Sequence, residues 1–564
     1  MFSEKLLEQD EALRQAWQRE FSHIYGQRTF PASSDAGLPL KPVYAPADIK
    51  DIPYETIGVP GVYPYTRGIY PLHYQYQPWI SQPVHGFGLP EQTRERMDLL
   101  AREGMAGYFG VTAYNLTFDT ASKAGLDPDD PLAQGLVGYG GTSLSTLDDM
   151  ARLFHDLPLD RTSVVLNVSN MSIVGLALYL AYAERRGVKP EKLRGNTMNW
   201  LYYAAFSDFD SFLPQGAFEL SSELIKYCTC YMPRWNTTNL FGYIVEETGG
   251  NAIQEVAFVL AASAALTRCC QEVGLHADQF LPRFSFQMGQ GNDFFEQVAK
   301  LRALRQAWAS LNRERFGCRD EHSLQARIHV HTAGSTLAAQ QPLNNVVRAT
   351  LQTLGAVLGG ANSIHTCAYD EALSIPTEEA ATLALRTQQV IVHESNIPAV
   401  GDPLGGSYYV EWLTQRLVRE VFTLLDKIEG LGGFQRCWES GWFRRELEHT
   451  AYEVRRQVEK GERVVVGVNK YGVGDTPPVP QFRRDPEVER IAGERVRQWR
   501  QSRDNETCQK ALTRLRAAAE RSHTGGWKMA DMLMVPLVQA ARSGATLGEM
   551  ASVLKQVYGW GCAY

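Results

Sequence analysis

Short apolar runs alternate with longer helical stretches between about residue 105 and residue 395. Most of the runs are rich in Val, Ile, Phe or Tyr and follow a turn or a helix-ending signal, which is typical of buried strands. Consecutive parallel strands need crossover connections, so this alternation predicts a parallel sheet. The strands that we predict are Ala106–Thr112, Ser163–Val168, Gly195–Leu201, Asn239–Val245, Arg283–Met288, Ala326–Thr332, Asn362–Cys367 and Gln389–Glu394.

Eight strand–helix units are the number that closes a (β/α)8 barrel. We therefore predict an α/β fold, a (β/α)8 TIM barrel with an extended N-terminal arm and a helical C-terminal region. In such a barrel the chemistry takes place at the carboxyl ends of the strands.

The segments that flank the predicted barrel differ from it in pattern. Residues 1–88 begin with an amphipathic helix and continue as an arm rich in Pro, Gly and Tyr. Because many exposed rings would be costly, we expect this arm to form a tunnel wall or a subunit contact. The barrel is predicted at 89–430, and 431–564 is a linker followed from 487 by three or four helices.

Composition excludes several classes of protein. The 564 residues are 44% hydrophobic and 21% charged with a net charge of −7, which is ordinary for a globular protein and gives no general attraction to nucleic acid. No stretch approaches 18 uninterrupted apolar residues, and the charged N-terminus is unlike a signal peptide. Nine scattered cysteines without a Cys-x-x-Cys motif indicate reduced thiols, so we expect a cytoplasmic protein.

The densest group of reactive side chains follows the sixth and seventh predicted strands. His329 and His331 alternate along one strand and therefore share a face, while Ser363, His365, Asp370 and Glu371 lie where the next strand runs into a helix. Such a group is compatible with a metal site or with hydrogen-bonded interior polar groups. No His-x-x-x-His pair or Cys ligand set occurs, so we predict no metal.

Two further groups follow other strands. Glu246 and Glu247 come after the fourth strand, where carboxylates either begin a helix or bind a polar ligand. Arg283 and Ser285 share one face of the fifth strand. Gly-x-Ser-x-Gly, Walker A and Rossmann motifs are absent, so nothing supports a hydrolase, an ATPase or a dehydrogenase.

In this order the groups resemble the large subunit of adenosylcobalamin-dependent acyl-CoA mutases, which include the methylmalonyl-CoA, isobutyryl-CoA and 2-hydroxyisobutyryl-CoA mutases. The similarity runs from about Tyr44 to the C-terminus. Its landmarks are YPYTRGIYP, FDTASKAGLDPDDP, MPRWN, FGY, SIHTCAYDEAL, TQQVIVHES, DPLGGSYYVE and VVGVNKY.

The resemblance implies a carbon-skeleton isomerase that uses adenosylcobalamin to start a radical rearrangement of an acyl thioester inside a solvent-shielded barrel. Carried over by motif, the catalytic residues are Tyr243, His329 and His331. The residues that bind the cofactor are Glu247 and Glu371 at the ribose, and Phe118, Gly140, Gly334 and Ala372 at the corrin or nucleoside. The substrate channel is lined by Tyr70, Val84, Ile244, Arg283, Ser285 and Ser363.

One part of the family pattern is missing. The family's Asp-x-His-x-x-Gly motif, whose His ligates cobalt, has no counterpart, and the nearest string, Asp320–Gln325, lacks the Gly. We therefore expect a separate small cobalamin-binding subunit to supply the ligand, in a heterotetramer.

The chain also departs from the pattern in the channel. Val84 replaces a Tyr, Ile244 replaces the His that bonds the thioester carbonyl, and His331 replaces a Gln. Gln77 and Gln82 replace two basic residues that meet CoA. Three hypotheses remain open: a mutase of a less polar acyl-CoA, a mutase of an acyl group on a carrier protein, and a non-catalytic homologue that acts as a structural partner.

Overall fold

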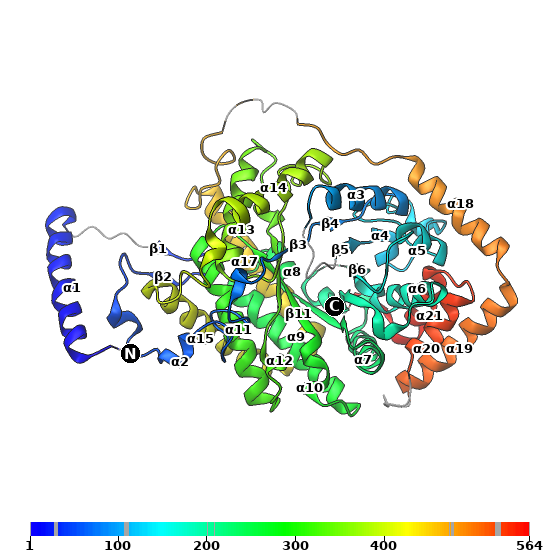
Figure 1. Ribbon diagram of the computed structural model, residues 1–564, viewed down its shortest axis with the longest axis horizontal. Coiled ribbons are helices and arrows are strands. Elements are labelled where there is room, and N and C mark those ends of the chain that lie inside the picture. Colours follow the sequence, from blue (N-terminus) through cyan, green and yellow to red (C-terminus); the bar gives the residue numbers. More distant parts are fainter. Residues whose placement is uncertain are drawn as a thin grey trace.

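The computed structural model describes residues 2–26, 32–105, 112–199, 201–207, 209–472, 474, 479–524 and 532–562. Two five-stranded parallel sheets lie at its centre, with helices around them (Figure 1). One sheet has the order β10-β11-β12-β13-β3 and the other the order β4-β5-β6-β7-β9. The parallel α/β class is therefore confirmed.

The strands of the first sheet are β10 Thr238–Phe241, β11 Phe284–Gln290, β12 Ile328–Thr332, β13 Ser363–His365 and β3 Ile80–Ser81. Those of the second sheet are β4 Val84–His85, β5 Thr112–Thr117, β6 Thr162–Asn167, β7 Arg194–Thr197 and β9 Trp235–Asn236. Two short antiparallel pairs complete the set, β1 Ala32–Ser33 with β2 Pro39–Leu40 and β8 Ser211–Phe212 with β14 Trp560–Gly561.

The edge strands of the two sheets follow one another directly along the chain, β3 before β4 and β9 before β10. Two residues separate β3 from β4, and one residue separates β9 from β10. Among the described residues, hydrogen bonds do not join the sheets into one closed ring.

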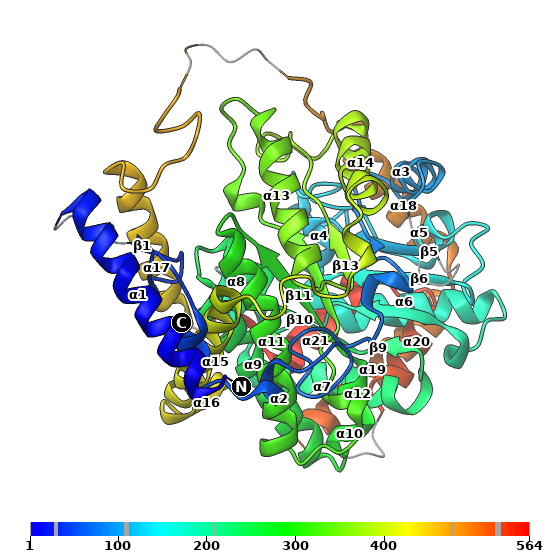
Figure 2. The same ribbon diagram turned by 60° about the vertical axis from the view of Figure 1, so that its left-hand side comes forward.

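Helices connect the strands and cover the sheets in both views (Figures 1 and 2). Before and between the strands these are α1 Glu4–Tyr25, α2 Tyr54–Ile57, α3 Pro90–Arg102, α4 Thr120–Lys123, α5 Leu147–Leu153, α6 Ser172–Arg185, α7 Pro214–Tyr231, α8 Tyr243–Glu247, α9 Ala252–Glu272, α10 Ala277–Phe280, α11 Phe294–Arg315, α12 Glu321–Leu324 and α13 Asn344–Leu358. After the last strand of the sheets come α14 Glu378–Glu394, α15 Tyr408–Gly430, α16 Gly433–Glu439, α17 Trp442–Glu459, α18 Glu487–Ser502, α19 Asn505–Thr524, α20 Met534–Arg542 and α21 Leu547–Tyr558.

The predicted strand Gln389–Glu394 is wrong, because this segment is the end of α14. Its Val-Ile-Val run favoured a strand, but Leu385, Gln388 and Ile391 are buried at helical spacing and Thr377 caps the helix. Gln388 accepts hydrogen bonds from the Trp79 ring nitrogen and the Ser81 hydroxyl, which fixes α14 against β3.

The strand that takes its place lies in the segment predicted as an arm. β3 pairs with β13 and β4 pairs with β5, with Pro83 between them. Proline cannot donate to a ladder, so the run is broken into two short pieces that no pattern search detects. Of the predicted strand Ala106–Thr112, residues 106–111 lie outside the described residues, and Thr112 begins β5.

The six remaining predicted strands are confirmed in place, although several end earlier than predicted. β10 ends at Phe241, and the residues Tyr243–Val245 belong to the short helix α8 instead. Gly242 caps α8, and a Cβ at this position would lie 3.0 Å or less from Glu255 and Met288, so a close approach at this turn requires glycine.

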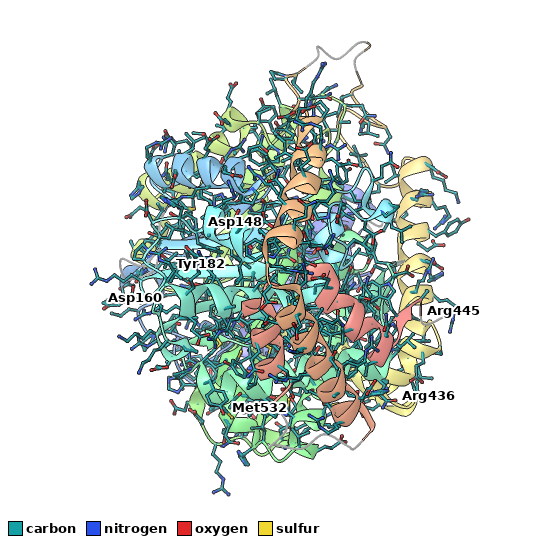
Figure 3. All side chains as sticks on the ribbon, turned by 90° about the vertical axis from the view of Figure 1, so that its right-hand side faces the viewer. Asp148, Asp160, Tyr182, Arg436, Arg445 and Met532 are labelled. Atoms are coloured by element: carbon teal, nitrogen blue, oxygen red, sulfur yellow. The ribbon has the colours of Figure 1, made fainter. Side chains whose placement is uncertain are left out.

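From residue 487 onward, where three or four helices were predicted, the described residues form α18 to α21, and α20 and α21 pack against α6 and α7. Figure 3 views these helices, with Met532 just before α20 and Tyr182 on α6. At the opposite side of Figure 1, α1 packs against the turn at Pro46–Ile49.

One helix within the described residues, α9, is long and apolar enough to cross a membrane. Packing accounts for its composition, because 78% of its apolar window is buried against the rest of the protein.

Candidate active site

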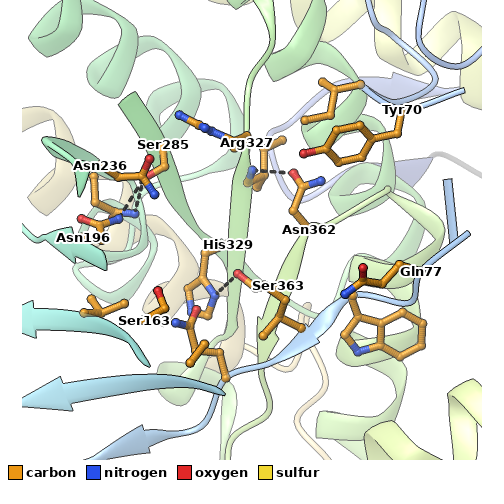
Figure 4. A pocket seen from close by; sticks show the side chains of 18 of the residues that line it. Tyr70, Gln77, Ser163, Asn196, Asn236, Ser285, Arg327, His329, Asn362 and Ser363 are labelled. Carbon is orange, nitrogen blue, oxygen red and sulfur yellow. Dashed lines mark hydrogen bonds between the residues drawn. The ribbon is translucent and has the colours of Figure 1, made fainter. Parts of the chain in front are cut away.

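A cavity of about 820 Å³ opens at the amino ends of the parallel strands. Figure 4 shows side chains from both sheets and from the N-terminal arm pointing into it. Five residues predicted from the sequence to line the substrate channel or to act in it lie on its wall: Tyr70, Arg283, Ser285, His329 and Ser363. Gln77 and Gln82 of the arm also lie there, so the arm forms one wall of the cavity, which is one of the two roles that we expected for it.

Arginines collect at the outer end of this cavity. Arg194 and Arg234 stand at or just before the starts of strands in one sheet, and Arg283 and Arg327 stand just before strands of the other. All four line the same cavity. No carboxylate lines the cavity among the described residues. Burial lowers the pKa of Arg283, which has no bonded partner there. A cluster of guanidinium groups without a carboxylate beside it favours an anionic ligand.

Sequence analysis identified Arg283 and missed the other three arginines. The search concentrated on the carboxyl ends of the strands, where the chemistry of a barrel usually lies. The available signal was an Arg directly before or at the start of a strand in the strings RGNT, RWN and RIHV.

Deeper in the cavity, several polar but uncharged side chains lie among apolar ones. The Ser285 hydroxyl accepts from the Asn196 and Asn239 amides at 3.0 and 3.1 Å. The side-chain oxygens of Asn115 and Asn196 are buried without a partner. Buried acceptors of this kind are costly unless a bound group donates to them. The wall therefore suits a ligand with several N–H or O–H groups.

His329 and Ser363 close the inner end of the cavity, with the imidazole Nδ1 2.7 Å from the hydroxyl. His329 is buried, and its Nε2 has no partner. Burial lowers the pKa of His329 from 6.5 to about 3, so its ring is neutral in the folded protein.

This shift predicts how His329 affects stability at low pH. The unfolded chain binds a proton at His329 below pH 6.5 while the folded chain does not, so its stabilising contribution is lost as the pH falls. Relative to a His329→Asn variant, the native chain should lose about 1.4 kcal/mol per pH unit below about pH 6.5. Parallel denaturant titrations at several pH values measure this difference. A His449→Asn variant, changed at an exposed site, is the control, and its difference in stability from the native chain should not change in this way with pH.

The next layer of side chains lies two residues further along the same strands, or about 7 Å toward their carboxyl ends. His331 and His365 are register partners on β12 and β13, and their ring centroids are 4.1 Å apart. The Tyr243 ring lies on the other side of His331 at 4.2 Å. Tyr243 of α8, His331 of β12 and His365 of β13 therefore form a stack of tilted rings.

Hydrogen bonds fix the histidines of this stack. Nδ1 of His331 donates to the Thr332 carbonyl at 2.9 Å, and Nδ1 of His365 accepts from the Val84 amide at 3.0 Å. His331, His365 and Cys367 are close enough to bind a metal ion together. However, the Cys367 thiol donates to the Thr332 carbonyl at 3.1 Å, and His365 carries its proton on the other nitrogen. A metal would have to displace both protons.

Two carboxylates lie next to this stack at the carboxyl ends of the strands, a region that we call the rim. Glu247 accepts from the Ser335 amide and hydroxyl at 3.1 and 3.2 Å and is bonded to the Tyr243 hydroxyl. Glu371 accepts from the Ala368 amide at 2.6 Å, and its Oε1 is 3.8 Å from Nε2 of His365. Burial raises the pKa of Glu247. The structure thus brings together four predicted residues, Tyr243, Glu247, His331 and Glu371, through successive contacts that include His365.

The other predicted cofactor residues lie around this rim at the ends of strands and in the following turns. Gly334 begins the turn after β12, next to Glu247 and Tyr243. Phe118 is fully buried beside the end of β5, whereas Gly140 and Ala372 are exposed. Ile244 is half-buried next to Val165 and Met198. The roles assigned to these residues stay predictions.

A buried ion network holds α8 beneath the rim. Lys300 of α11 contacts Glu246 at 3.0 Å and Glu255 at 2.5 Å, and it donates to the Gly289 carbonyl at 2.9 Å. Burial raises the pKa of Glu255 to about 7 against the opposing effect of Lys300. Since Glu246 is the neighbour of Glu247, Lys300 also fixes where Glu247 lies.

Comparison with known proteins identifies relatives of this chain. The sequence profile of the methylmalonyl-CoA mutase family matches residues 33–560. The 2-hydroxyisobutanoyl-CoA mutase large subunit of Aquincola tertiaricarbonis is 36% identical over 535 residues, which are 93% of this chain and 91% of that protein. The methylmalonyl-CoA mutase large subunit of Streptomyces virginiae is 36% identical over 527 residues, or 93% of this chain and 70% of that protein. Methylmalonyl-CoA mutase of Escherichia coli K12 is 35% identical over 529 residues, or 93% and 71%. The chain therefore belongs to the methylmalonyl-CoA mutase family, whose members are isomerases that use adenosylcobalamin.

Proposed function

We propose that this chain is the large, catalytic subunit of an adenosylcobalamin-dependent mutase that rearranges the carbon skeleton of an acyl-CoA, and that a small subunit supplies the cobalt ligand. The observation that carries the proposal is the 820 Å³ cavity, which has arginines at one end and His329 and Ser363 at the other, one layer below the stack at Tyr243, His331 and His365.

We further propose that the two sheets together form a (β/α)8 barrel. The chain passes directly from one sheet to the other at both edges, between β3 and β4 and between β9 and β10. Both sheets also contribute side chains to the one cavity, as the interior of a barrel requires.

CoA is the thioester carrier that the cavity suits best. Gln77 and Gln82 lack the positive charge of the residues that they replace, but Arg194, Arg283 and Arg327 provide cations at the same opening. Guanidinium groups bind phosphates well. The unpaired amide oxygens further in match the N–H groups of a pantetheine arm. These features favour CoA over an acyl group on a carrier protein, which would bring a single phosphodiester.

The rim residues fit the nucleoside part of the cofactor. A Cβ on Gly334 would stand 3.3 Å from Glu247 Oε2 and 3.4 Å from the Tyr243 hydroxyl, so glycine leaves room above both groups. Glu247 and Glu371 keep free lone pairs that can accept from ribose hydroxyls. When bound, adenosylcobalamin supplies the homolytic chemistry that starts the rearrangement.

The remaining tasks belong to this chain's own residues. The arginines and the polar wall hold the CoA portion, so the acyl group reaches the stack. Tyr243 and Ile244 close the space around it and exclude water, which protects a reactive carbon centre. Val84 presents an apolar side chain there and uses its amide to orient His365.

The proposal of a separate small subunit has two supports. The Aquincola tertiaricarbonis relative is named a large subunit, and this chain covers 91% of it. The nearest string to the cobalt-ligating motif lies in and around α12, which precedes β12 and so is at the amino ends of the strands. His322 is exposed there and bonded to Asp320, on the far side from Glu247 and Glu371.

Glu371→Ala should weaken cofactor use by about 10-fold or more while leaving the thermal midpoint nearly unchanged. The side chain accepts one amide hydrogen bond and is only partly buried, so folding depends little on it. A lost hydrogen bond to a charged group costs about 1.5–3 kcal/mol. The measurement is the adenosylcobalamin concentration that half-saturates the reconstituted complex. An unchanged requirement would contradict the assigned role.

Binding tests the proposed function before any turnover. The full chain should bind an acyl-CoA thioester, and a co-expressed small cobalamin-binding protein should copurify with it. Calorimetry with butyryl-CoA and with butyryl-pantetheine separates the part of the binding free energy that the arginines contribute through the phosphates from the part that the pantetheine contributes. Binding of neither thioester, or equal binding of both, would contradict the CoA assignment, and the latter would favour the carrier-protein alternative.

A further inference from the structure

The N-terminal arm forms one wall of the cavity although it has almost no regular structure of its own. Within residues 58–79, all of which the structure describes, the one regular element is a single turn at His73–Gln75. Residues 69–74 and 76–79 nevertheless line the cavity, and Tyr70 and Gln77 point into it in Figure 4. Because an irregular segment has a large conformational entropy to lose, it keeps such a position only where other elements fix it.

Arg305 of α11 holds the arm through its backbone. Its guanidinium donates to the Tyr65 carbonyl at 3.0 Å and to the Thr66 carbonyl at 3.0 and 3.3 Å. A further bond of 3.4 Å to the Gly360 carbonyl joins the same group to the turn before β13. Arg305 is buried, so little water competes for these bonds. The arm is therefore fixed just before its cavity-lining part begins.

Arg67 holds the arm through its side chain. Its Nε donates to Oδ2 of Asp402 at 2.8 Å, and its other nitrogens donate to the carbonyls of Gly58 and Asp402 at 3.1 and 3.3 Å. The same Oδ2 of Asp402 accepts from Arg302 of α11 at 2.5 Å, and Arg302 also contacts Glu411 of α15 at 2.5 Å. Arg67, Asp402, Arg302 and Glu411 thus form a chain of alternating charges, which we call the arm anchor.

The arm anchor joins two strings of the sequence that the family resemblance identified. Arg67 lies in YPYTRGIYP, and Asp402 and Glu411 are the first and last residues of DPLGGSYYVE. Neither Arg67 nor the second string is part of the cavity lining, whereas Tyr70 lies three residues after Arg67 and is part of it. The arm anchor therefore acts on the cavity only through the arm.

We propose that Arg67 and Asp402 are positioning residues for ligand binding: their ion pair holds the arm so that Tyr70 and Gln77 meet the bound CoA thioester. This inference rests on the proposed function. Without the ion pair, the ligand must order the arm at the moment of binding, and each side chain that is ordered then reduces the affinity.

Arg67→Met tests the positioning role in the full chain. Arg302 still contacts Asp402 when Arg67 is lost, so no buried carboxylate is left unpaired and the thermal midpoint should fall only slightly. Hydrogen exchange of the amides in residues 59–79 should become faster. The dissociation constant of butyryl-CoA, measured by calorimetry, should rise by about 10-fold. Arg67→Lys restores the ion pair without the full set of carbonyl bonds and should recover much of the affinity.

Gly405→Ala disturbs the same ion pair without removing a charge. A Cβ at Gly405 would lie 2.4 to 2.5 Å from the Arg67 guanidinium, so the alanine variant displaces that group. It should also weaken the binding of butyryl-CoA, and combining it with Arg67→Met should add little to the loss from either. Arg315→Met, which removes an exposed ion pair with Asp426 on the helix that carries Arg302, should change neither exchange nor affinity.

The outcomes separate this inference from the proposed function. Unchanged affinity in Arg67→Met and Gly405→Ala, or exchange in residues 59–79 that does not increase, overturns the positioning role and leaves acyl-CoA binding intact. If Arg67→Met does not fold, Gly405→Ala decides in the same way. A native chain that binds no butyryl-CoA counts against the proposed function, and with it against a positioning role in binding, whatever the exchange rates show.

Discussion

Replacing Arg283 with methionine should weaken the binding of an acyl-CoA thioester by about 10- to 100-fold. Arg283 lines the outer end of the cavity, has no partner among the described residues, and has its pKa lowered by burial. A half-buried guanidinium without a counter-ion is unfavourable until an anion arrives, and a charge-assisted hydrogen bond contributes about 1.5–3 kcal/mol. Calorimetric titration of the purified chain measures the loss.

Two comparisons make the effect of Arg283 specific. The loss should be confined to CoA thioesters, because a pantetheine thioester lacks the phosphates, and it should shrink as salt is added. Arg497→Met removes an exposed cation on α18 and should leave both affinities unchanged. If Arg283→Met weakened both thioesters equally, the residue would be supporting the wall and not binding phosphate.

Replacing Lys300 with methionine should destabilise the chain by about 3–5 kcal/mol and lower its thermal midpoint. The ammonium group contacts Glu246 and Glu255 in the interior, and removing it leaves two carboxylates facing each other. Breaking a buried ion pair from one side has a cost of this size. Differential scanning calorimetry measures the midpoint.

The pH dependence distinguishes this effect from a simple packing loss. The pKa of Glu255 is about 7 with Lys300 present, and losing the cation raises it further. An acid whose folded pKa is raised adds stability below its unfolded pKa of 4.5 and loses it as the pH rises. The defect of Lys300→Met should therefore be smaller at pH 5.5 than at pH 8. Lys510→Met, which removes an exposed ion pair with Glu506, should change stability by less than about 1 kcal/mol at either pH. A pH-independent defect would show that the carboxylates are not the cause.

The strands buried on both sides were predictable because their composition differs sharply from that of the helices around them. The region from Ser163 to His365 therefore yielded the correct order of strands. Two predictions failed, the strand at Gln389–Glu394 and the arm segment that contains β3 and β4. In both, the local composition favours one structure and tertiary packing imposes another. Val390 and its neighbours favour a strand but sit in a helix that packs through Gln388, while β3 and β4 are too short and too interrupted by Pro83 to be recognised.

The rim of the site was predictable from motifs, and its outer end was not. Glu247 and Glu371 follow strands directly, so the expectation that barrel chemistry lies at carboxyl ends located them. Arg194 and Arg327 come from strands of different sheets and line one cavity only because of how the two sheets pack. The different proton positions of His331 and His365 depend on backbone partners, Thr332 and Val84, which no sequence pattern reveals.

The fate of the carbon skeleton is the most direct test of the proposed activity. The chain would be co-purified with a small cobalamin-binding subunit, loaded with adenosylcobalamin and given 13C-labelled acyl-CoA thioesters, with and without a hydroxyl group. Carbon NMR should show the label moving between a linear and a branched skeleton at constant mass. A complex that binds both cobalamin and the thioesters but leaves every labelled skeleton unchanged would contradict the assignment as a mutase.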